Sequence, residues 1–234
     1  MKDKHIPFYL EKKLSLFGIN TKEDLLKYNF IEVYKWIKDI YPSSSFKILF
    51  DLFCITNNIQ FNSLTSKLKN EIKNTYKLFP PSYAPLEYST MVGYLNQAKN
   101  ILEMGDNLNE IPVGAIVVCN EKIIATAKNM CINDNITNHA EIIAINKASL
   151  FLKTSRLINC DLYVTIEPCL MCSGAIINSR IKRLIFGAPQ PKTGAVLSQY
   201  KVLENLNVNK HTQVIGPISQ SYAQQMQLYF LNKR

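Results

Sequence analysis

Two short clusters of metal-binding and acidic residues constrain this chain more than any other feature. The first cluster holds His139 and Glu141, and the second holds Cys169 and Cys172. An imidazole, two thiols and a carboxylate are thus divided between two segments that lie about thirty residues apart in the sequence. A fold that uses these groups together has to bring both segments into contact.

The residue types in these clusters favour a hydrolytic zinc centre. Zinc takes four ligands, and a catalytic site supplies three from the protein while leaving the fourth position for water. His139, Cys169 and Cys172 are such a set, so we expect one Zn²⁺ in each subunit. The spacing of the cysteines predicts that both sulfurs lie on one face of a helix, with Pro168 at its first position. The positive helix terminus would favour the thiolate, which is the form that binds metal.

Glu141 is not needed as a ligand, so it is free to move protons for a metal-activated water. A Cys-x-x-Cys pair alone also fits a redox pair or half of a structural zinc site. A structural site needs four protein ligands, and the sequence has no second pair to complete one. The other cysteines stand singly, at Cys54, Cys119, Cys131 and Cys160.

The pattern His-Ala-Glu followed by Pro-Cys-x-x-Cys resembles the zinc-dependent nucleobase deaminases. Within that superfamily, the chain is most similar to the bacterial tRNA-specific adenosine deaminases, from about residue 90 to the C-terminus. The motifs that carry the resemblance are Glu-Ile-Pro-Val-Gly-Ala at 110–115, His-Ala-Glu-Ile at 139–142, the segment 162–172, Asn-Ser-Arg-Ile at 178–181, Phe-Gly-Ala at 186–188 and Lys-Thr-Gly at 192–194.

The resemblance implies hydrolytic deamination of adenosine to inosine at the wobble position of a tRNA anticodon. Glu141 would be the catalytic proton shuttle beside a zinc-activated water. Asn129 matches the family's substrate-binding asparagine, and Val113 and Ile166 match residues that line the base pocket. The implied partners are the anticodon stem-loop of a tRNA, with an arginine tRNA expected, and a second subunit bound through residues 175–183 in a homodimer.

Two other classes of function remain open at this stage. A deaminase of a free base or nucleoside, of the guanine or cytosine type, would use the same zinc chemistry without RNA. Efficient deamination of small substrates would favour it. A non-catalytic RNA-binding or structural zinc module would require Glu141 to be dispensable.

The first part of the chain, residues 1–78, has helical spacing of apolar residues and no strand-like alternation. It resembles the C-terminal domain of the competence regulator TfoX. The segment around Gly18 and Asn20 is similar to a helix-hairpin-helix, which would contact nucleic acid through backbone N–H groups at its turn. A small helical packing or protein-interaction module is the alternative, and the partner of this domain is not indicated.

A proline-rich linker is predicted at residues 79–88, and a zinc-dependent deaminase domain at 89–234. In the latter, strand-like and helical segments alternate. We therefore expect an α/β fold, a three-layer α-β-α domain of the cytidine-deaminase type with a mixed central sheet, preceded by a small all-α domain. A last helix is predicted at 219–232.

Charge and hydropathy limit the location and the partners of the protein. Its 234 residues carry a formal net charge of +9, which favours a polyanionic partner only weakly because lysines usually lie on solvated helix faces. No apolar run approaches the roughly 20 residues of a membrane-spanning helix, and the start lacks the apolar core of a signal peptide. We expect a soluble, cytoplasmic protein with reduced cysteines.

Overall fold

The computed structural model describes residues 6–103, 110–132, 135–204, 212–218, 223–224 and 228. Its internal contacts divide the chain into two compact units, Met1–Pro85 and Leu86–Arg234. The domain boundaries at residues 78 and 89 that we inferred from composition stay a prediction.

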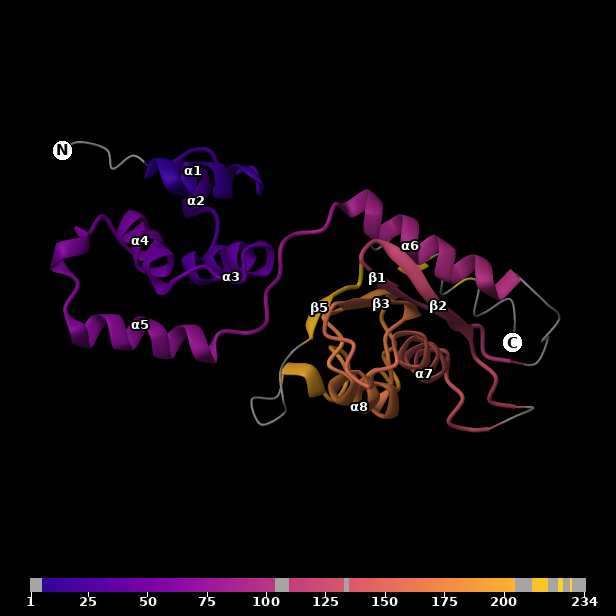
Figure 1. Ribbon diagram of the computed structural model, residues 1–234. Coiled ribbons are helices and arrows are strands. Elements are labelled where there is room, and N and C mark those ends of the chain that lie inside the picture. Colours follow the sequence, from indigo (N-terminus) through magenta and orange to yellow (C-terminus); the bar gives the residue numbers. More distant parts are fainter. Residues whose placement is uncertain are drawn as a thin grey trace. The chain divides into compact units, whose positions relative to one another are not determined.

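The described part of the first unit is entirely helical (Figure 1). Its apolar side chains form one core that includes Leu10, Leu25, Ile37 and Leu49, all fully buried. The elements are α1 (Phe8–Ser15), α2 (Lys22–Leu26), α3 (Phe30–Ile40), α4 (Phe46–Asn57), the short 3₁₀ helix η1 (Phe61–Ser63) and α5 (Ser66–Leu78).

The turn between α1 and α2 has the backbone of a helical hairpin. Gly18 adopts a φ of +71°, a region that glycine occupies without steric cost. Asp24 then accepts hydrogen bonds from the N–H groups of Asn20 (3.2 Å) and Thr21 (3.1 Å). These N–H groups meet a carboxylate of the chain itself, so this turn offers no support for the phosphate-binding interpretation and favours a packing role.

The proline-rich segment after α5 lies against α3. The indole Nε1 of Trp36 donates a hydrogen bond to the hydroxyl of Ser82 at 2.8 Å, and the N–H of Ala84 donates to Asp39 at 3.1 Å. Ser82 is buried by these contacts. Residues 79–84 are therefore held on the helical unit, and little chain is left before the second unit begins at Leu86.

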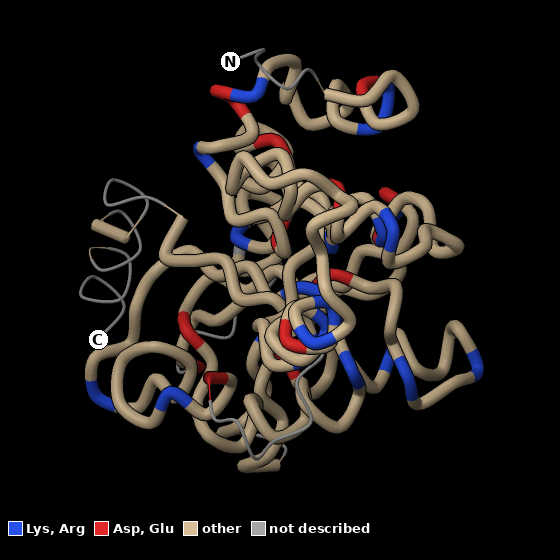
Figure 2. Tube along the Cα trace, turned by 90° about the vertical axis from the view of Figure 1, so that its left-hand side faces the viewer, with Lys and Arg blue, Asp and Glu red and all other residues tan. Residues whose placement is uncertain are grey.

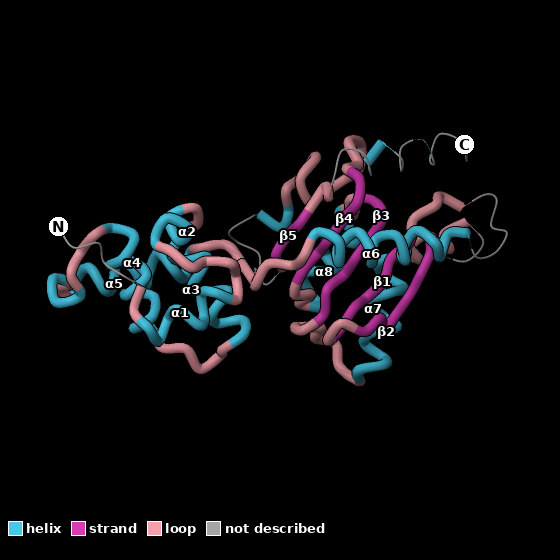
Figure 3. The backbone as a smooth tube through the Cα atoms, turned by 90° about the horizontal axis from the view of Figure 1, so that it is seen from above, coloured by secondary structure: helices cyan, strands magenta, loops and turns pink. Residues whose placement is uncertain are grey.

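The second unit contains a mixed sheet with the strand order β2-β1-β3-β4-β5 (Figure 3). β1 is antiparallel to both β2 and β3, whereas β3, β4 and β5 run parallel to one another. The strands are β1 (Gly114–Cys119), β2 (Lys122–Lys128), β3 (Cys160–Ile166), β4 (Arg183–Ala188) and β5 (Gln213–Ile215). Asn120 and Glu121 form the tight β1–β2 hairpin with positive φ angles of 49° and 61°.

Helices cover both faces of this sheet (Figure 1). One face packs against α6 (Tyr88–Asn100), which continues into η2 (Ile101–Glu103). The other face packs against α7 (Ala140–Leu152) and α8 (Leu170–Ser179), followed later by η3 (Val202–Glu204). The predicted three-layer α-β-α fold is confirmed, because the alternating strands and helices form two apolar cores on opposite sides of one sheet.

Close packing between α6 and the sheet depends on a glycine. A side-chain Cβ on Gly114 would collide with the carbonyl oxygen of Ala98 in α6. The absence of that atom lets the helix lie directly on the start of β1. The helix predicted at 219–232 falls mostly outside the described residues. Among the residues that are described, no helix has the length and apolar character needed to cross a membrane.

Candidate metal and catalytic site

Two helix N-termini hold the three predicted metal ligands. His139 is the N-cap residue of α7, and Cys169 is the N-cap residue of α8. Cys172 lies one turn further along α8 and is completely buried. The positive end of the α8 dipole therefore lies beside Cys169, which favours the thiolate form of that residue.

Our prediction that Pro168 opens α8 is wrong, because the helix begins at Leu170. The carbonyl group of Pro168 accepts a hydrogen bond from Ala195 at 2.9 Å, and Cys169 forms a β-bridge with Gly194. This pairing keeps Cys169 extended, with φ −74° and ψ 177°. The two sulfurs thus meet through an N-cap and the first turn, and not through two helical positions on one face.

The three ligand atoms fit a tetrahedral zinc site. The Nδ1 atom of His139 lies 3.7 Å from the Sγ of Cys169 and 3.5 Å from the Sγ of Cys172. All three atoms lie within 4.8 Å of one another. With zinc–sulfur and zinc–nitrogen bonds of about 2.3 and 2.0 Å, an edge of a coordination tetrahedron measures roughly 3.6 Å. Side chains and spacing both fit the metal.

The three ligand side chains shift one another's pKa values. The hydrogen bond from the thiol of Cys172 lowers the pKa of Cys169 to about 4, and His139 adds to this effect. The same contact, together with burial, raises the pKa of Cys172. The pKa of His139 is raised, chiefly by its contact with Cys169. A divalent cation would replace the protons that these groups hold between them.

Glu141 lies in the first turn of α7, next to the ligand cluster. Its side chain is 3% exposed, and burial raises its pKa to about 7. Its Oε2 atom is buried and has no hydrogen-bond partner among the described residues. A buried carboxyl oxygen without a partner is costly unless a ligand or water completes it. Glu141 therefore lies beside the ligand cluster with a raised pKa and with one carboxyl oxygen that no described residue satisfies, and its role as a proton carrier stays a prediction.

Asn129 fixes the start of α7. Its side-chain Oδ1 atom accepts a hydrogen bond from the backbone N–H of Ala140 at 2.8 Å, and its backbone N–H donates to the carbonyl oxygen of Val113 at 3.0 Å. The side chain is 5% exposed. Sequence reasoning assigned this residue to the substrate, and the structure shows that its oxygen is already bonded to the helix that carries Glu141. Only the amide NH₂ is left to meet a base.

The two predicted pocket residues lie at the edges of the core below α7. Val113 immediately precedes β1, and Ile166 ends β3. Both are buried and belong to the same apolar cluster as Ala140. The structure therefore gathers them on the face of the sheet that carries α7, and their contact with a base stays a prediction.

Sequence reasoning missed Glu167, which holds the loop at 190–198 against the site. Its Oε1 atom accepts three backbone N–H groups, from Val196 (3.1 Å), Leu197 (2.7 Å) and Ser198 (2.8 Å). Its Oε2 atom accepts the N–H of Gln190 at 3.0 Å and the hydroxyl of Ser198. A charged residue at the end of an apolar strand was the available signal, since such a residue is rarely buried without partners.

The loop closes on Glu167 so tightly that glycine is required at one position. A Cβ on Gly194 would lie 2.5 Å from the Glu167 carboxyl group and 2.6 Å from the carbonyl oxygen of Gln190. Gly194 is also the residue that pairs with Cys169. Glu167 lies two positions before Cys169. Its carboxylate thus connects the loop to the segment that carries two of the three predicted metal ligands.

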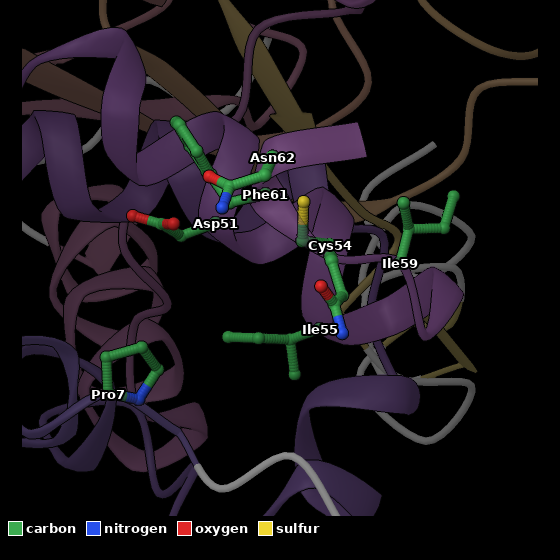
Figure 4. Close-up of a pocket in the computed structure, with 8 residues that line it drawn as sticks. Pro7, Asp51, Cys54, Ile55, Ile59, Phe61 and Asn62 are labelled. Carbon is green, nitrogen blue, oxygen red and sulfur yellow. The ribbon is translucent and has the colours of Figure 1, made fainter. Parts of the chain in front are cut away.

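A separate cavity of about 280 Å³ lies in the helical unit (Figure 4). Residues of α4 and the following turn form most of its wall, including Asp51, Cys54 and Asn62. None of its lining residues belongs to the second unit. The cavity is therefore unrelated to the metal cluster.

Comparison with known proteins decides the family. Residues 92–227 match the model of the MafB19-like deaminase family. A tRNA-specific adenosine deaminase from Haemophilus influenzae is 38% identical over 143 residues, which cover 60% of this chain and 83% of the relative. One from Buchnera aphidicola subsp. Schizaphis graminum is 46% identical over 126 residues, 53% of this chain and 83% of the relative. The chain belongs to the tRNA-specific adenosine deaminase family.

A solved structure supports the same family assignment for the second unit. It comes from work on A-to-I editing by tRNA:A34 deaminases at the wobble position of transfer RNA. It is 34% identical, has a TM-score of 0.53 and covers 58% of this chain and 99% of its own. In this member of the tRNA-specific adenosine deaminase family, the deaminase region is preceded by the helical unit. Residues 4–76 of that unit match the TfoX C-terminal domain. That resemblance is confirmed.

Proposed function

We propose that this protein deaminates adenosine to inosine at the wobble position of a tRNA anticodon. One observation carries the proposal: a buried carboxyl oxygen of Glu141, which has no hydrogen-bond partner among the described residues, lies beside the cluster of His139, Cys169 and Cys172. The relatives of the chain are tRNA-specific adenosine deaminases. Water replaces the amine at C6 of adenine, and ammonia leaves.

The catalytic chemistry divides between a metal and one carboxylate. His139, Cys169 and Cys172 would hold a Zn²⁺ ion, which supplies a water of lowered pKa and stabilises developing negative charge. Glu141 would take one proton from the attacking water and give it to a ring nitrogen of adenine. It would then take the second proton from the new hydroxyl group at C6 and give it to the amine, which leaves as ammonia. A carboxyl group with a pKa near 7 suits both directions of transfer.

The base is bound between polar and apolar groups. Asn129 donates from its amide NH₂ to an acceptor on the base, since its Oδ1 is bonded to Ala140. Val113 and Ile166 pack against the ring. A site built to satisfy the hydrogen-bonding edge of one base rejects another whose edge would leave buried groups unpaired.

The RNA and protein partners follow from the same assignment. The substrate is an anticodon stem-loop, and an arginine tRNA is the first candidate. Two copies of the chain assemble through the region 175–183. Ile176, Ser179 and Ile181 are already buried within one copy, so the partner would contact the intervening side chains and the exposed Leu170 and Met171 at the start of α8. We place the enzyme in the cytoplasm with its tRNA.

The decisive experiment uses zinc-loaded protein and an arginine anticodon stem-loop carrying adenosine at the wobble position. Inosine is read by sequencing for the wild type and for Glu141→Gln, which keeps the shape of the side chain and removes its proton chemistry. We expect inosine from the wild type and a loss of at least about 100-fold in the variant, with zinc content unchanged.

Other outcomes select the competing functions. If the zinc-loaded wild type leaves the stem-loop and full-length tRNA unchanged but deaminates guanine, cytosine or a nucleoside, the enzyme acts on small molecules. Full activity in Glu141→Gln would remove the proposed proton shuttle. A monomeric mass measured by light scattering at micromolar protein concentration would contradict the proposed homodimer.

A further inference from the structure

Positive charge in the helical unit is concentrated on one helix. Among residues 6–65, seven lysines are balanced by six acidic residues. In α5, residues 66–78, four lysines accompany a single acidic residue, Glu71. Three of the four excess positive charges among residues 6–78 therefore lie on α5, whose charged positions are marked with those of the whole chain in Figure 2.

The ammonium groups of α5 are not neutralised by acidic side chains among the described residues. Elsewhere, Lys27 pairs with Asp24 at 2.8 Å and Lys47 pairs with Asp51 at 3.4 Å. Within the part of the chain that the structure describes, the four α5 lysines form no ion pair. Their charge is therefore available to a partner of opposite sign.

Three of these lysines form a row, which we call the α5 lysine face: Lys69, Lys73 and Lys77. They are four residues apart, so they follow one side of the helix at steps of about 6 Å. The Nζ of Lys69 lies 5.1 Å from the ring centroid of Phe61, and that of Lys73 lies 5.4 Å from the ring centroid of Phe46. These aromatic rings support the lysine stems and restrict their motion, which lowers the entropy lost on binding.

Only a short segment of chain connects the helical unit to the unit that carries the metal cluster. α5 ends at Leu78, and residues 79–84 are fastened to α3. The second unit begins at Leu86. A short connection of this kind gives a ligand held by one unit a high effective concentration at the other. A long polyanion bound by one unit is therefore kept near the other by the chain itself.

We infer that the α5 lysine face is a second RNA-binding surface, which contacts phosphates of the tRNA outside its anticodon stem-loop. The inference rests on the proposed function for its choice of polyanion. The metal site engages one nucleotide of the anticodon, so most phosphates of a tRNA remain free for other contacts. Lysine rows bind such phosphates as point charges, without sequence preference and with strong dependence on salt.

The test compares two triple variants of the full chain that lose the same charge. The first is Lys69→Gln, Lys73→Gln and Lys77→Gln. The matched control is Lys12→Gln, Lys13→Gln and Lys38→Gln, at positions on α1 and α3. This control also removes a lysine that contacts a ring, because the Nζ of Lys13 lies 3.6 Å from the ring centroid of Tyr41. Both are assayed for KM and kcat on full-length tRNA and on its anticodon stem-loop, over a series of salt concentrations.

We expect the first variant to raise KM for full-length tRNA by about tenfold at low salt, with kcat unchanged. Its salt dependence should flatten by about two to three in the slope of log affinity against log salt. KM for the stem-loop should stay within about twofold, and the control should match the wild type on both RNAs. If the triple variant folds poorly, Lys77→Gln alone takes its place. This change removes an exposed ammonium group that contacts no ring among the described residues, and it should give part of the effect.

Equal effects of both triple variants on full-length tRNA would overturn the inference, because net charge alone would explain them. An equal rise in KM for the stem-loop would overturn the placement outside it. If the wild type deaminates neither RNA, the proposed function fails, and fluorescence anisotropy with full-length tRNA then decides the inference by itself. Weaker tRNA binding in the first variant alone supports it, and unchanged binding overturns it.

Discussion

The Nδ1 atom of His139 lies 3.5 Å from the Sγ atom of Cys172, although 33 positions separate the two residues in the chain. His139 is the N-cap residue of α7 and Cys172 lies in the first turn of α8, and the N-termini of these helices meet on one side of the sheet. This distance is close to an edge of a zinc coordination tetrahedron. The cluster is therefore preorganised for metal by the packing of two helices.

Replacing Cys172 by serine should abolish zinc binding. A serine hydroxyl does not ionise near neutral pH, so the site would lose one of three protein ligands. We expect the zinc content after dialysis, measured by mass spectrometry of the metal, to fall from about one per chain to near zero. Cys131→Ser is the control, because that thiol donates to the carbonyl group of Asn138 and lies outside the ligand set. Equal zinc loss in both variants would contradict the assignment.

Glu167→Gln should destabilise the second unit. Each carboxylate oxygen accepts at least two hydrogen bonds. An amide NH₂ group in either place would leave at least one backbone N–H without its acceptor. Leaving such buried donors unsatisfied costs about 1–3 kcal/mol, which thermal or urea unfolding detects. Glu204→Gln, at an exposed position, should change the free energy of unfolding by less than about 0.5 kcal/mol. Unfolding of both variants at the wild-type midpoint would refute the role of Glu167.

The contribution of Glu167 should depend on pH. Burial raises its pKa, but the hydrogen bonds from Ser198 and from the backbone of Gln190 and Leu197 together outweigh burial, so the folded pKa is lowered. A lowered pKa means that the fold binds the proton less tightly than the unfolded chain. The stability advantage of wild type over Glu167→Gln should then be complete above about pH 5 and should shrink as pH falls below about 4. Melting temperatures of both proteins across pH 3–7 measure this difference, and a gap that widens in acid would contradict it.

Gly194→Ala should disturb the same loop by a steric route. The added methyl group would lie 2.5 Å from the Glu167 carboxyl group and 2.6 Å from a backbone carbonyl, so the loop must shift. We expect a loss of about 1–3 kcal/mol in the free energy of unfolding, as for other overpacked sites. Gly174→Ala in α8 is the matched control, since its Cβ would meet nothing within 4 Å and alanine favours helix. The control should be neutral or more stable, and a reversed order would refute the packing described for the loop.

Residue types and spacing in the sequence were sufficient for the overall architecture. The alternation of strand-like and helical segments in residues 89–234 predicted a mixed sheet between helices, as the structure has it. The ligand set could also be named in advance, because few residue types bind zinc and only one arrangement of them stood at the required spacing. These features depend on local propensity and on the chemistry of single side chains.

The tertiary structure decided how those side chains are held. Cys169 is an extended N-cap because Gly194, 25 positions later, pairs with it, and the oxygen of Asn129 is bonded to the N–H of Ala140. Glu167 looked like an ordinary strand-end charge until the loop at 190–198 closed around it. Such relationships arise from burial and pairing between distant segments. Local periodicity carries no record of them, so the sequence named the chemistry and the fold determined its geometry.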